Sequence, residues 1–388
     1  RRSRQTHQQR SRMQRIDQCR SSGCIYRSPL KRFQTALSCQ ARPSEKSAPL
    51  QSEYIMKKTI ILAVPYMYGL DQCIEKNLRF LGFEVINLCY DDRDSYYPNL
   101  GSRLKNLYHK HISKDGNYKK YLKYSRHLDD IQQKLALLNG KKADYALCIR
   151  ANIYPKEIIA TIREHSNVCV NYQWDGVGRF PDIIEYLDYF DQCWVFDPDD
   201  IQKYPQCRFK ATTNFYFDFP VAEYAPTNKL YFLGGYELRR EEQTKRFIQE
   251  TERLNLPLDF HIYCKDDRAE KAFGHNGIRY LDRSSILSFE ENLSQVQSCG
   301  AVVDFAQFEH YGLSFRIFDA LRFDKKLITT NKHILETDLY HPDRVFVWDG
   351  GNLDALPEFL ARPYQQPAPE IKAYYSFTQW LNRLLGID

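Results

Sequence analysis

The sequence predicts an α/β protein with two doubly wound, Rossmann-like domains in tandem. From residue 59 onward, short apolar runs alternate with amphipathic segments, which is the pattern of parallel strands that helices cover on both faces. The alternation stops at 217–229, where two prolines and several turn residues favour a linker, and then starts again. We therefore expect an N-terminal domain at 56–225, a C-terminal domain at 230–365, and a C-terminal helix at 370–388 that crosses back to the first domain.

The N-terminal domain begins with an apolar strand at 59–66, directly after Met56. The run "MKKTIILAV" also resembles the start of a secretory signal, but Pro65 interrupts the apolar run and no cleavage-site pattern follows. A buried first strand is therefore the better interpretation. The other expected strands are 83–88, 144–151, 167–173 and 192–197, and the expected helices are 70–82, 155–164 and 181–189.

The C-terminal domain repeats this alternation. Its expected strands are 230–236, 259–265, 300–306, 325–331 and 344–349, and its expected helices are 238–254, 288–298, 352–361 and one that opens at "GLSFRIFDALRF". The final amphipathic helix reads "YYSFTQWLNRLL". Two such domains would place the carboxyl ends of both sheets around one ligand site.

Residues 1–55 differ from the rest of the chain in charge. They carry 12 Lys and Arg against 3 Asp and Glu, whereas the remaining residues carry 43 against 46, so the overall charge of +6 comes from this tail. It has no apolar periodicity, and we expect it to be disordered. A transit peptide and an RNA-binding arm are both conceivable, but the simplest interpretation is that Met56 is the natural start and 1–55 is not native. We therefore expect no nucleic-acid partner.

The cysteines and acids give no sign of a metal site or a cofactor. Eight cysteines follow Met56, none in a CxxC pair and most within apolar runs, which indicates buried thiols in a reducing, cytoplasmic compartment. Two Asp-x-Asp patterns, Asp92–Asp94 and Asp197–Asp199, match metal-dependent transferases on paper, but the second is better explained as a helix start. No strand is followed by GxGxxG, and no run reaches the ~18 apolar residues of a membrane-spanning helix.

Residues 103–127 form a basic segment rich in tyrosine. It carries eight Lys and Arg against one acid, interleaved with four tyrosines. One interpretation is a solvated helical face. The other is a surface that meets an anionic acceptor or the headgroups of a membrane, which would make the protein peripheral on the inner face of the cytoplasmic membrane.

The stretch "EHYGLSFRIFDALRF" carries residues that packing alone does not explain. It follows an apolar strand, so the turn lies at the carboxyl edge of the sheet. Gly312 would let the chain approach a ligand closely, and the free N–H groups of the next helix favour phosphate. Arg316 and Asp319 share a helix face, so one charge could bind phosphate while the other accepts from ribose hydroxyls. The alternative is a surface helix capped by Ser314, with an exposed Arg316–Asp319 pair.

This segment resembles the nucleotide-sugar site of group-1-type GT-B glycosyltransferases, nearest to the lipopolysaccharide-core, capsule and spore-coat enzymes. Their pattern has an acidic residue, Gly-Leu-Ser/Pro, then R-x-F-E-A-L and a strand of the type KLIT-N, and this chain reads "EHYGLSFRIFDAL" and "KKLITTN". The stretches "YQWDGVGRFPD", "FDQCWVFDPDDIQKY" and "YSFTQWLNRLL" are also similar to that subgroup. The resemblance implies that Gly312, Leu313 and Ser314 line the donor phosphates, and that Glu309 and Asp319 are the acidic pair. Asp319 replaces the family's ribose-binding Glu, and the pair is ten positions apart instead of eight.

Five more residues are candidates at the carboxyl edges of the two sheets. In similar enzymes a basic residue just after the glycine turn "LGGYELRR" reaches the diphosphate, which points to Arg239 or Arg240, and Lys265 ends the next strand at the same edge. In "NYQWDGVGRF", Asp175 could take the acceptor hydroxyl's proton or bind sugar hydroxyls, and Trp174 offers a flat apolar face for a sugar ring. A turn aspartate that caps its loop is the structural alternative for Asp175.

These observations predict a metal-independent glycosyltransferase without a cofactor. We expect it to move a sugar from a nucleotide-sugar donor to a glycan or lipid-linked acceptor. The product would be a cell-surface glycan, either lipopolysaccharide or capsule. Arg316 and Asp175 are the expected catalytic residues. The alternative is a non-catalytic protein of the same fold that binds a nucleotide or a glycan.

Overall fold

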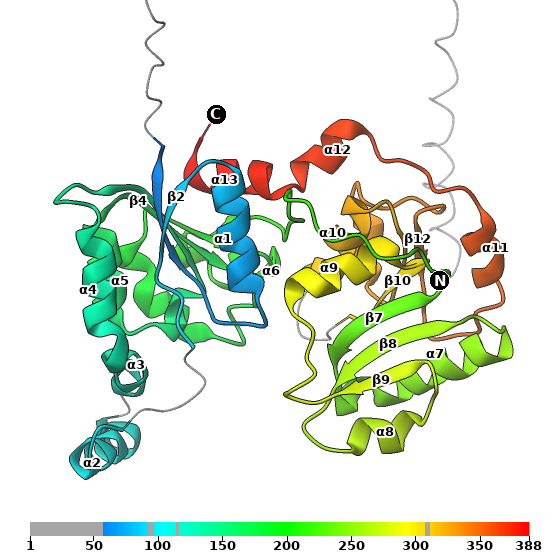
Figure 1. The fold of residues 1–388 in the computed structure, drawn as a ribbon, viewed down its shortest axis with the longest axis horizontal. Helices are drawn as coiled ribbons and strands as arrows, with labels where there is room; N and C mark the ends of the chain where they lie inside the picture. Colours follow the sequence, from blue (N-terminus) through cyan, green and yellow to red (C-terminus); the bar gives the residue numbers. More distant parts are fainter. Residues whose placement is uncertain (1–56, 92–96, 114–115, 307–310, 388) are drawn as a thin grey trace, which may run out of the picture. The chain divides into compact units, whose positions relative to one another are not determined.

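The computed structural model describes residues 57–91, 97–113, 116–306 and 311–387 (Figure 1). Residues Ile55–Asp388 form one compact unit. The predicted disorder of 1–55 lies outside the described residues. No helix in the described part of the chain is long and apolar enough to cross a membrane.

The first sheet has six parallel strands in the order β2-β1-β3-β4-β5-β6. Successive residues of β1 point into two different cores: Ile61 and Ala63 into one, Ile60 and Leu62 into the other. Burial on both faces is the reason the strands read as continuous apolar runs. The strands are β1 Thr59–Ala63, β2 Glu84–Asn87, β3 Ala143–Ile149, β4 Ser166–Gln173, β5 Gln192–Val195 and β6 Lys210–Ala211. The α-helices are α1 Leu70–Phe80, α2 Leu100–Tyr108, α3 Asn117–Tyr124, α4 Leu128–Ala136, α5 Lys156–Glu164 and α6 Asp199–Lys203.

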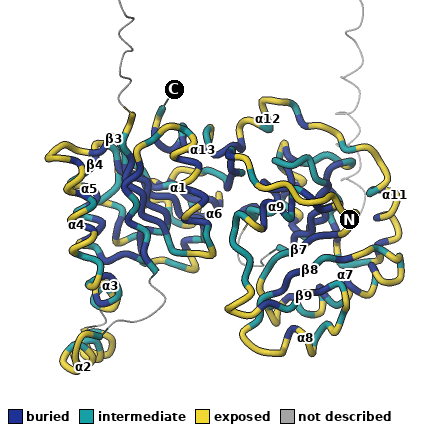
Figure 2. The backbone as a smooth tube through the Cα atoms, viewed as in Figure 1, coloured by how far each residue is buried: buried dark blue, intermediate teal, exposed yellow. Residues whose placement is uncertain are grey.

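The second sheet also has six parallel strands, in the order β12-β11-β10-β7-β8-β9. Its chain runs outward from β7 to β9 on one side and from β10 to β12 on the other, which is the Rossmann order. The strands are β7 Leu230–Gly235, β8 Leu258–Tyr263, β9 Ile278–Leu281, β10 Ala301–Asp304, β11 Lys326–Thr329 and β12 Val345–Val347. The α-helices are α7 Glu241–Arg253, α8 Arg268–Phe273, α9 Phe289–Ser298, α10 Phe315–Arg322 and α11 Leu356–Ala361. Figure 2 shows the strands largely buried and the outer helix surfaces exposed.

The C-terminal segment returns to the first sheet, as predicted. Helix α12 (Pro369–Tyr374) is followed by α13 (Phe377–Leu385), whose apolar face joins the same core as Ile60 and Leu62. The Trp380 ring packs against Tyr172 of β4 and Phe215, with ring centroids 5.2 and 4.2 Å apart. This helix therefore belongs to the first core, although it follows the second domain in sequence.

The predicted fold class, two doubly wound domains with a crossing helix, is confirmed. Strands β6 and β9 and helices α4 and α8 were not predicted; the two strands are short and alternate too little to stand out from loops. The segment 181–189 is a 3₁₀-helix and not an α-helix, and the predicted helix 238–254 begins with a 3₁₀ turn at Leu238–Arg240. Of the eight described cysteines, six are buried, as their position within apolar runs predicted.

Trp380 tests how much the crossing helix contributes to stability. Trp380→Ala should lower the free energy of unfolding by about 3–5 kcal/mol, because the ring is fully buried among aromatic side chains. Chemical denaturation measures this, with Gln379→Ala on the exposed side of α13 as the control. A loss no larger than that of Gln379→Ala would show that α13 is not part of the first core in solution.

Candidate functional site

The site lies where β7 and β10 part in the second sheet. The chain adds β8 and β9 on one side of this point and β11 and β12 on the other, while all strands stay parallel. Open α/β folds bind ligands outside the carboxyl ends of the strands at such a point. β7 and β10 pair only at Leu230–Ala301 and Tyr231–Val302, near their first residues. Toward their carboxyl ends the two strands no longer pair with each other, which leaves space between them for a side chain.

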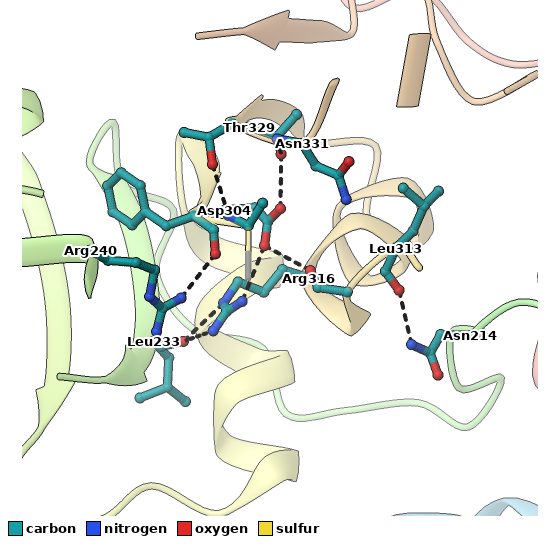
Figure 3. Close-up of polar contacts among 12 residues, drawn as sticks. Asn214, Leu233, Arg240, Asp304, Leu313, Arg316, Thr329 and Asn331 are labelled. Atoms are coloured by element: carbon teal, nitrogen blue, oxygen red, sulfur yellow. Dashed lines mark hydrogen bonds and ion pairs between the residues drawn. The ribbon is translucent and has the colours of Figure 1, made fainter. Parts of the chain in front are cut away.

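Arg316 of α10 occupies this space (Figure 3). Its Nε and Nη2 donate to the Leu233 carbonyl at 2.9 and 2.8 Å, and its Nη1 donates to Asp304 Oδ1 at 3.1 Å. The guanidinium lies 4.9 Å from the centre of the Phe232 ring. Three of its five N–H donors are used by these described residues, which leaves two, and the side chain is 25% exposed. Arg316 therefore joins the two strand ends and keeps donors for a ligand.

Asp304 is the acceptor that organises this edge. Its side chain is 1% exposed and accepts from Ser314 Oγ and Thr329 Oγ1, each at 2.8 Å, in addition to Arg316. The sequence analysis missed Asp304. An acid that ends an otherwise apolar strand, "AVVD", was the available signal, because a charge at such a position needs a partner.

Ser314 stands at the N-cap of α10, but its hydroxyl bonds to Asp304 and makes no capping hydrogen bond. The alternative of a capped surface helix is therefore wrong. The first N–H groups of α10 have no side-chain cap, and such an uncapped helix start favours an anion. Ser314 and Arg316 reach the same carboxylate, so the helix start and the guanidinium are fixed together.

The loop before α10 contacts the first domain. The Leu313 carbonyl accepts from Asn214 Nδ2 at 2.9 Å, and the Tyr311 N–H donates to Asp197 Oδ2 at 3.3 Å. A Cβ on Gly312 would lie 2.1 Å from Cε2 of Phe196, which follows β5. The close approach predicted for Gly312 is thus one to Phe196, a residue of the first domain.

Asp319 is 1% exposed and lies within the protein. The alternative of an exposed Arg316–Asp319 pair is wrong, because Arg316 pairs with Asp304 instead. Asp319 Oδ1 has no hydrogen-bond partner among the described residues, and neither has the buried Nη1 of Arg322. Burial raises the pKa of Asp319 to about 7, and the charges of Arg322 and Arg316 oppose this rise only in part.

The two basic residues predicted beside the diphosphate lie on the surface of this edge. Arg239, in the 3₁₀ turn after β7, and Lys265, after β8, are both exposed. The neighbouring Arg240 is buried and donates to the Phe305 carbonyl at 3.0 Å, so it holds β7 against β10 (Figure 3). Glu309 lies outside the described residues.

A small surface pocket adjoins the site. Arg240 and Glu237 contribute its charges, and Phe232, Tyr236, Phe273 and Phe305 contribute its aromatic walls. It opens at the carboxyl ends of β7 and β8, beside the turn that carries Arg239.

Asp175 lies at the carboxyl edge of the first sheet, between two arginines. Arg150 Nη1 donates to its Oδ2 at 3.1 Å, and Arg179 Nη1 lies 3.4 Å from its Oδ1. The Arg150 guanidinium also stacks over the Phe180 ring, 3.6 Å from its centre. Arg150 follows β3 directly and has a left-handed backbone (φ 51°), a conformation that is uncommon for residues other than glycine. The sequence analysis did not single it out.

Trp174 follows β4 and is buried, with its ring edge-on to Phe315, the first residue of α10. Protein covers most of the face that was predicted to meet a sugar. In the described part of the chain, no group of three or more His, Cys, Asp or Glu side chains could hold a metal ion. Asp197 uses its oxygens for the N–H groups of Asp199 and Tyr311, and Asp92 and Asp94 lie outside the described residues.

The chain matches no known protein-family model, and no curated protein matches it in sequence. Among solved structures, it is similar to the glycosyltransferase SnogD from Streptomyces nogalater, with 13% identity over 86% of this chain and 100% of that one, and a TM-score of 0.44. An α-glucosyltransferase in complex with UDP and DNA is 10% identical over 78% and 89%, with a TM-score of 0.48. A glycosyltransferase from Rickettsia africae is 10% identical over 86% and 98%, with a TM-score of 0.44. At these values the fold assignment rests on the two strand orders.

The packing of Gly312 against Phe196 can be measured. Gly312→Ala should lower the free energy of unfolding by about 1–3 kcal/mol, because the added methyl group has no space beside the ring. Phe196→Leu in the same chain should recover part of this loss, so the two changes are not additive. Chemical denaturation gives each value. Gly235→Ala is the control, because a Cβ there meets no atom within 4 Å. Additive losses would place Phe196 away from this glycine.

The buried carboxyl group of Asp319 predicts a pH dependence of stability. The pKa of Asp319 rises from 3.8 to about 7 on folding. Between these two pH values the folded protein therefore holds a proton there that the unfolded chain has lost. This contribution therefore favours folding near pH 4 and is lost as the pH rises through 7. Asp319→Asn should be more stable than the parent protein at pH 8, by on the order of 1–3 kcal/mol, and its stability should vary less between pH 5 and 8.

Unfolding in urea at several pH values measures this difference. Asp188→Asn, an exposed substitution, should leave the pH profile unchanged. If Asp319→Asn had the same profile as the parent protein, the carboxyl group would not be buried as described.

Proposed function

We propose that this protein is a glycosyltransferase of the GT-B type that moves a sugar from a nucleotide-sugar donor to a cell-surface glycan. The sequence resemblance supplies the reaction class. The observation that carries the proposal is the placement of Arg316, two of whose donors are not used by the described residues, beside the uncapped start of α10 where β7 and β10 part. The comparisons with solved structures are consistent with this class but carry none of the argument.

The chemistry of this edge suits a departing diphosphate. When the bond between sugar and nucleotide breaks, negative charge grows on the leaving phosphate, and fixed donors aimed at that charge lower the barrier. Arg316 and the first N–H groups of α10 are such donors. Asp304 also accepts from Ser314 and Thr329, so its carboxylate keeps two hydrogen bonds when the donors of Arg316 bond to a phosphate.

Arg239 and Lys265 extend this donor site outward. Both are exposed at the carboxyl edge of the second sheet, where a bound diphosphate would meet them. A charged group bonded to a phosphate contributes about 1.5–3 kcal/mol, so the loss of either residue should weaken donor binding about ten- to hundredfold. Gly312, Leu313 and Ser314 would present the loop backbone to the same group, and Glu309 is the proposed acidic residue of the donor site. Asp319, predicted as its partner, is buried within the protein and does not reach a ligand there.

Asp175 would act on the acceptor side. Both of its oxygens already lie near guanidinium groups, so the arrangement favours binding and orienting a sugar hydroxyl over taking its proton. Trp174 is buried, so any contact that it makes with the acceptor would be small. We propose a lipid-linked glycan of the lipopolysaccharide or capsule type as acceptor, a cytoplasmic location and no requirement for a metal.

The proposed activity is tested with a panel of UDP-, GDP-, CDP- and ADP-sugars. Release of the nucleoside diphosphate from one of them, unaffected by a chelator, is the expected result. A protein that binds one donor tightly without any release would be the non-catalytic alternative. Release that stops with the chelator would require a metal and overturn that part of the proposal.

Arg316→Lys then tests the site. It keeps one positive charge near Asp304 but carries its donors on a single nitrogen, so it cannot reproduce the separate bonds of Nε, Nη1 and Nη2, and turnover should fall at least tenfold. Turnover and thermal unfolding are measured together, with Arg246→Lys on the exposed side of α7 as the control. A loss of turnover that only follows the loss of folded protein would make Arg316 a structural residue and nothing more.

A further inference from the structure

Helix α2 exposes its apolar face and turns its polar face toward the protein. No residue of α2 or of the π-helical turn after it, His109–Ser113, is buried. Leu100, Leu104, Leu107, Tyr108 and Ile112 are 52–75% exposed. The partly buried residues are Ser102, Asn106 and His109, which are spaced four and three residues apart. Every apolar side chain of α2 is exposed. An ordinary surface helix has the opposite arrangement.

The polar face of the helix makes one ring contact with α3 and hydrogen bonds within its own segment. The His109 ring stacks on Tyr118 of α3, with ring centres 4.4 Å apart, and Asn106 Nδ2 donates to the Tyr97 hydroxyl at 3.2 Å. Asn99 caps the helix, since its Oδ1 accepts from the Ser102 N–H at 2.8 Å. The polar face of the helix therefore has contacts of its own, while the leucines are exposed. Figure 2 shows α2 as largely exposed.

The exposed residues form one continuous stripe. Leu100, Leu104 and Leu107 recur every three or four residues, and Tyr108 and Ile112 continue the row. The other large exposed apolar side chains of the described chain are scattered along its length, such as Leu137 and Leu335. Scattered residues of this kind need no explanation, but a contiguous apolar patch marks an interaction surface.

The charge around the stripe has one sign. Between residues 97 and 127 the described chain has seven Lys and Arg residues and no Asp or Glu. Arg103 and Lys105 lie on the two sides of Leu104, one helical step away in each direction, and Lys110 and Lys119 are also exposed. Lys120 is paired with Asp182, so it contributes less to this charge. The partner must therefore accept an apolar stripe with cations along both of its edges.

We propose that α2 and its neighbouring basic residues form a docking surface for an anionic lipid bilayer. A helix of this kind lies in the plane of the membrane, with its apolar stripe among the acyl chains and its cations at the headgroups. Each Lys or Arg near an anionic membrane surface contributes about 1 kcal/mol, and Tyr108 is of a type that favours this boundary. A second copy of the chain fits less well, because its stripe would bring the same positive charges together. The proposal does not depend on the glycosyltransferase activity.

Flotation with vesicles tests this surface in the full chain. The probes are vesicles of phosphatidylcholine with about one-third phosphatidylglycerol, and vesicles of phosphatidylcholine alone. The variant is Leu104→Ser with Leu107→Ser, which removes apolar area and keeps the charge, so electrostatic attraction of the basic tail stays the same. Its matched control is Leu137→Ser with Leu335→Ser, two exposed leucines outside the stripe. Circular dichroism shows that each variant is folded.

Several outcomes decide the proposal. We expect the parent protein and the control to float with the anionic vesicles, and the stripe variant to bind at least tenfold more weakly. Equal binding of the stripe variant would assign the attraction to charge elsewhere, such as the tail, and overturn the proposal. No binding by the parent protein would overturn it too. A dimer in light scattering that the stripe variant breaks, without vesicle binding, would make the stripe an interface between copies. None of these readouts uses turnover, so failure here leaves the proposed activity as it stands.

Discussion

The hydrogen bonds of Arg316 to Leu233 and Asp304 are the interaction on which the candidate site depends. The two central strands, β7 and β10, pair only near their first residues and part toward their carboxyl ends. The Leu233 carbonyl of β7 and the Asp304 carboxylate of β10 are left at this opening. One guanidinium satisfies both. A carboxylate as buried as Asp304 needs such a partner, and the removal of one member of a buried pair is far more destabilising than the pair is stabilising. The same residue thus holds the strands and presents a positive charge at the position where the fold binds ligands.

The loop before α10 places this charge at the contact with the first domain. Leu313 and Tyr311 are bonded to Asn214 and Asp197, and Gly312 admits the ring of Phe196. A residue with a side chain at 312 would push the loop away and move the helix start with it. The glycine of the sequence motif is therefore required by packing in the protein alone, before any ligand is considered. This gives a physical reason for a glycine that a motif by itself cannot distinguish from a ligand contact.

The sequence predicted most of the fold but only part of the site. Strands such as 59–63 and 301–304 are buried on both faces, so composition identifies them, whereas β9 alternates over four residues and could not be told from a loop. Arg316 was identified, but its partners were not, because Leu233 is 83 residues away in the chain. Asp319 lies on the expected helix, but its burial comes from tertiary packing, which the helix pattern alone does not show. Ser314 has the sequence of a cap, but its hydroxyl is oriented toward Asp304, to which it donates, and makes no capping hydrogen bond. Such competition between a local and a distant partner cannot be read from spacing.

Helix α2 shows the same limit from the other direction. Its leucines recur with the period of a core-facing helix, and the pattern alone would place them inward. On the opposite face, His109 stacks on Tyr118 of α3 and Asn106 bonds to Tyr97 just before the helix, so the polar face is the one that contacts the protein. An apolar stripe that is held out by polar bonds is a cost to the isolated chain, since it leaves apolar area in water that another rotation of the helix would cover. That cost is offset only if the stripe is covered by something else, and positive charge on both of its edges, with no acid among the described residues there, restricts that cover to an anionic surface.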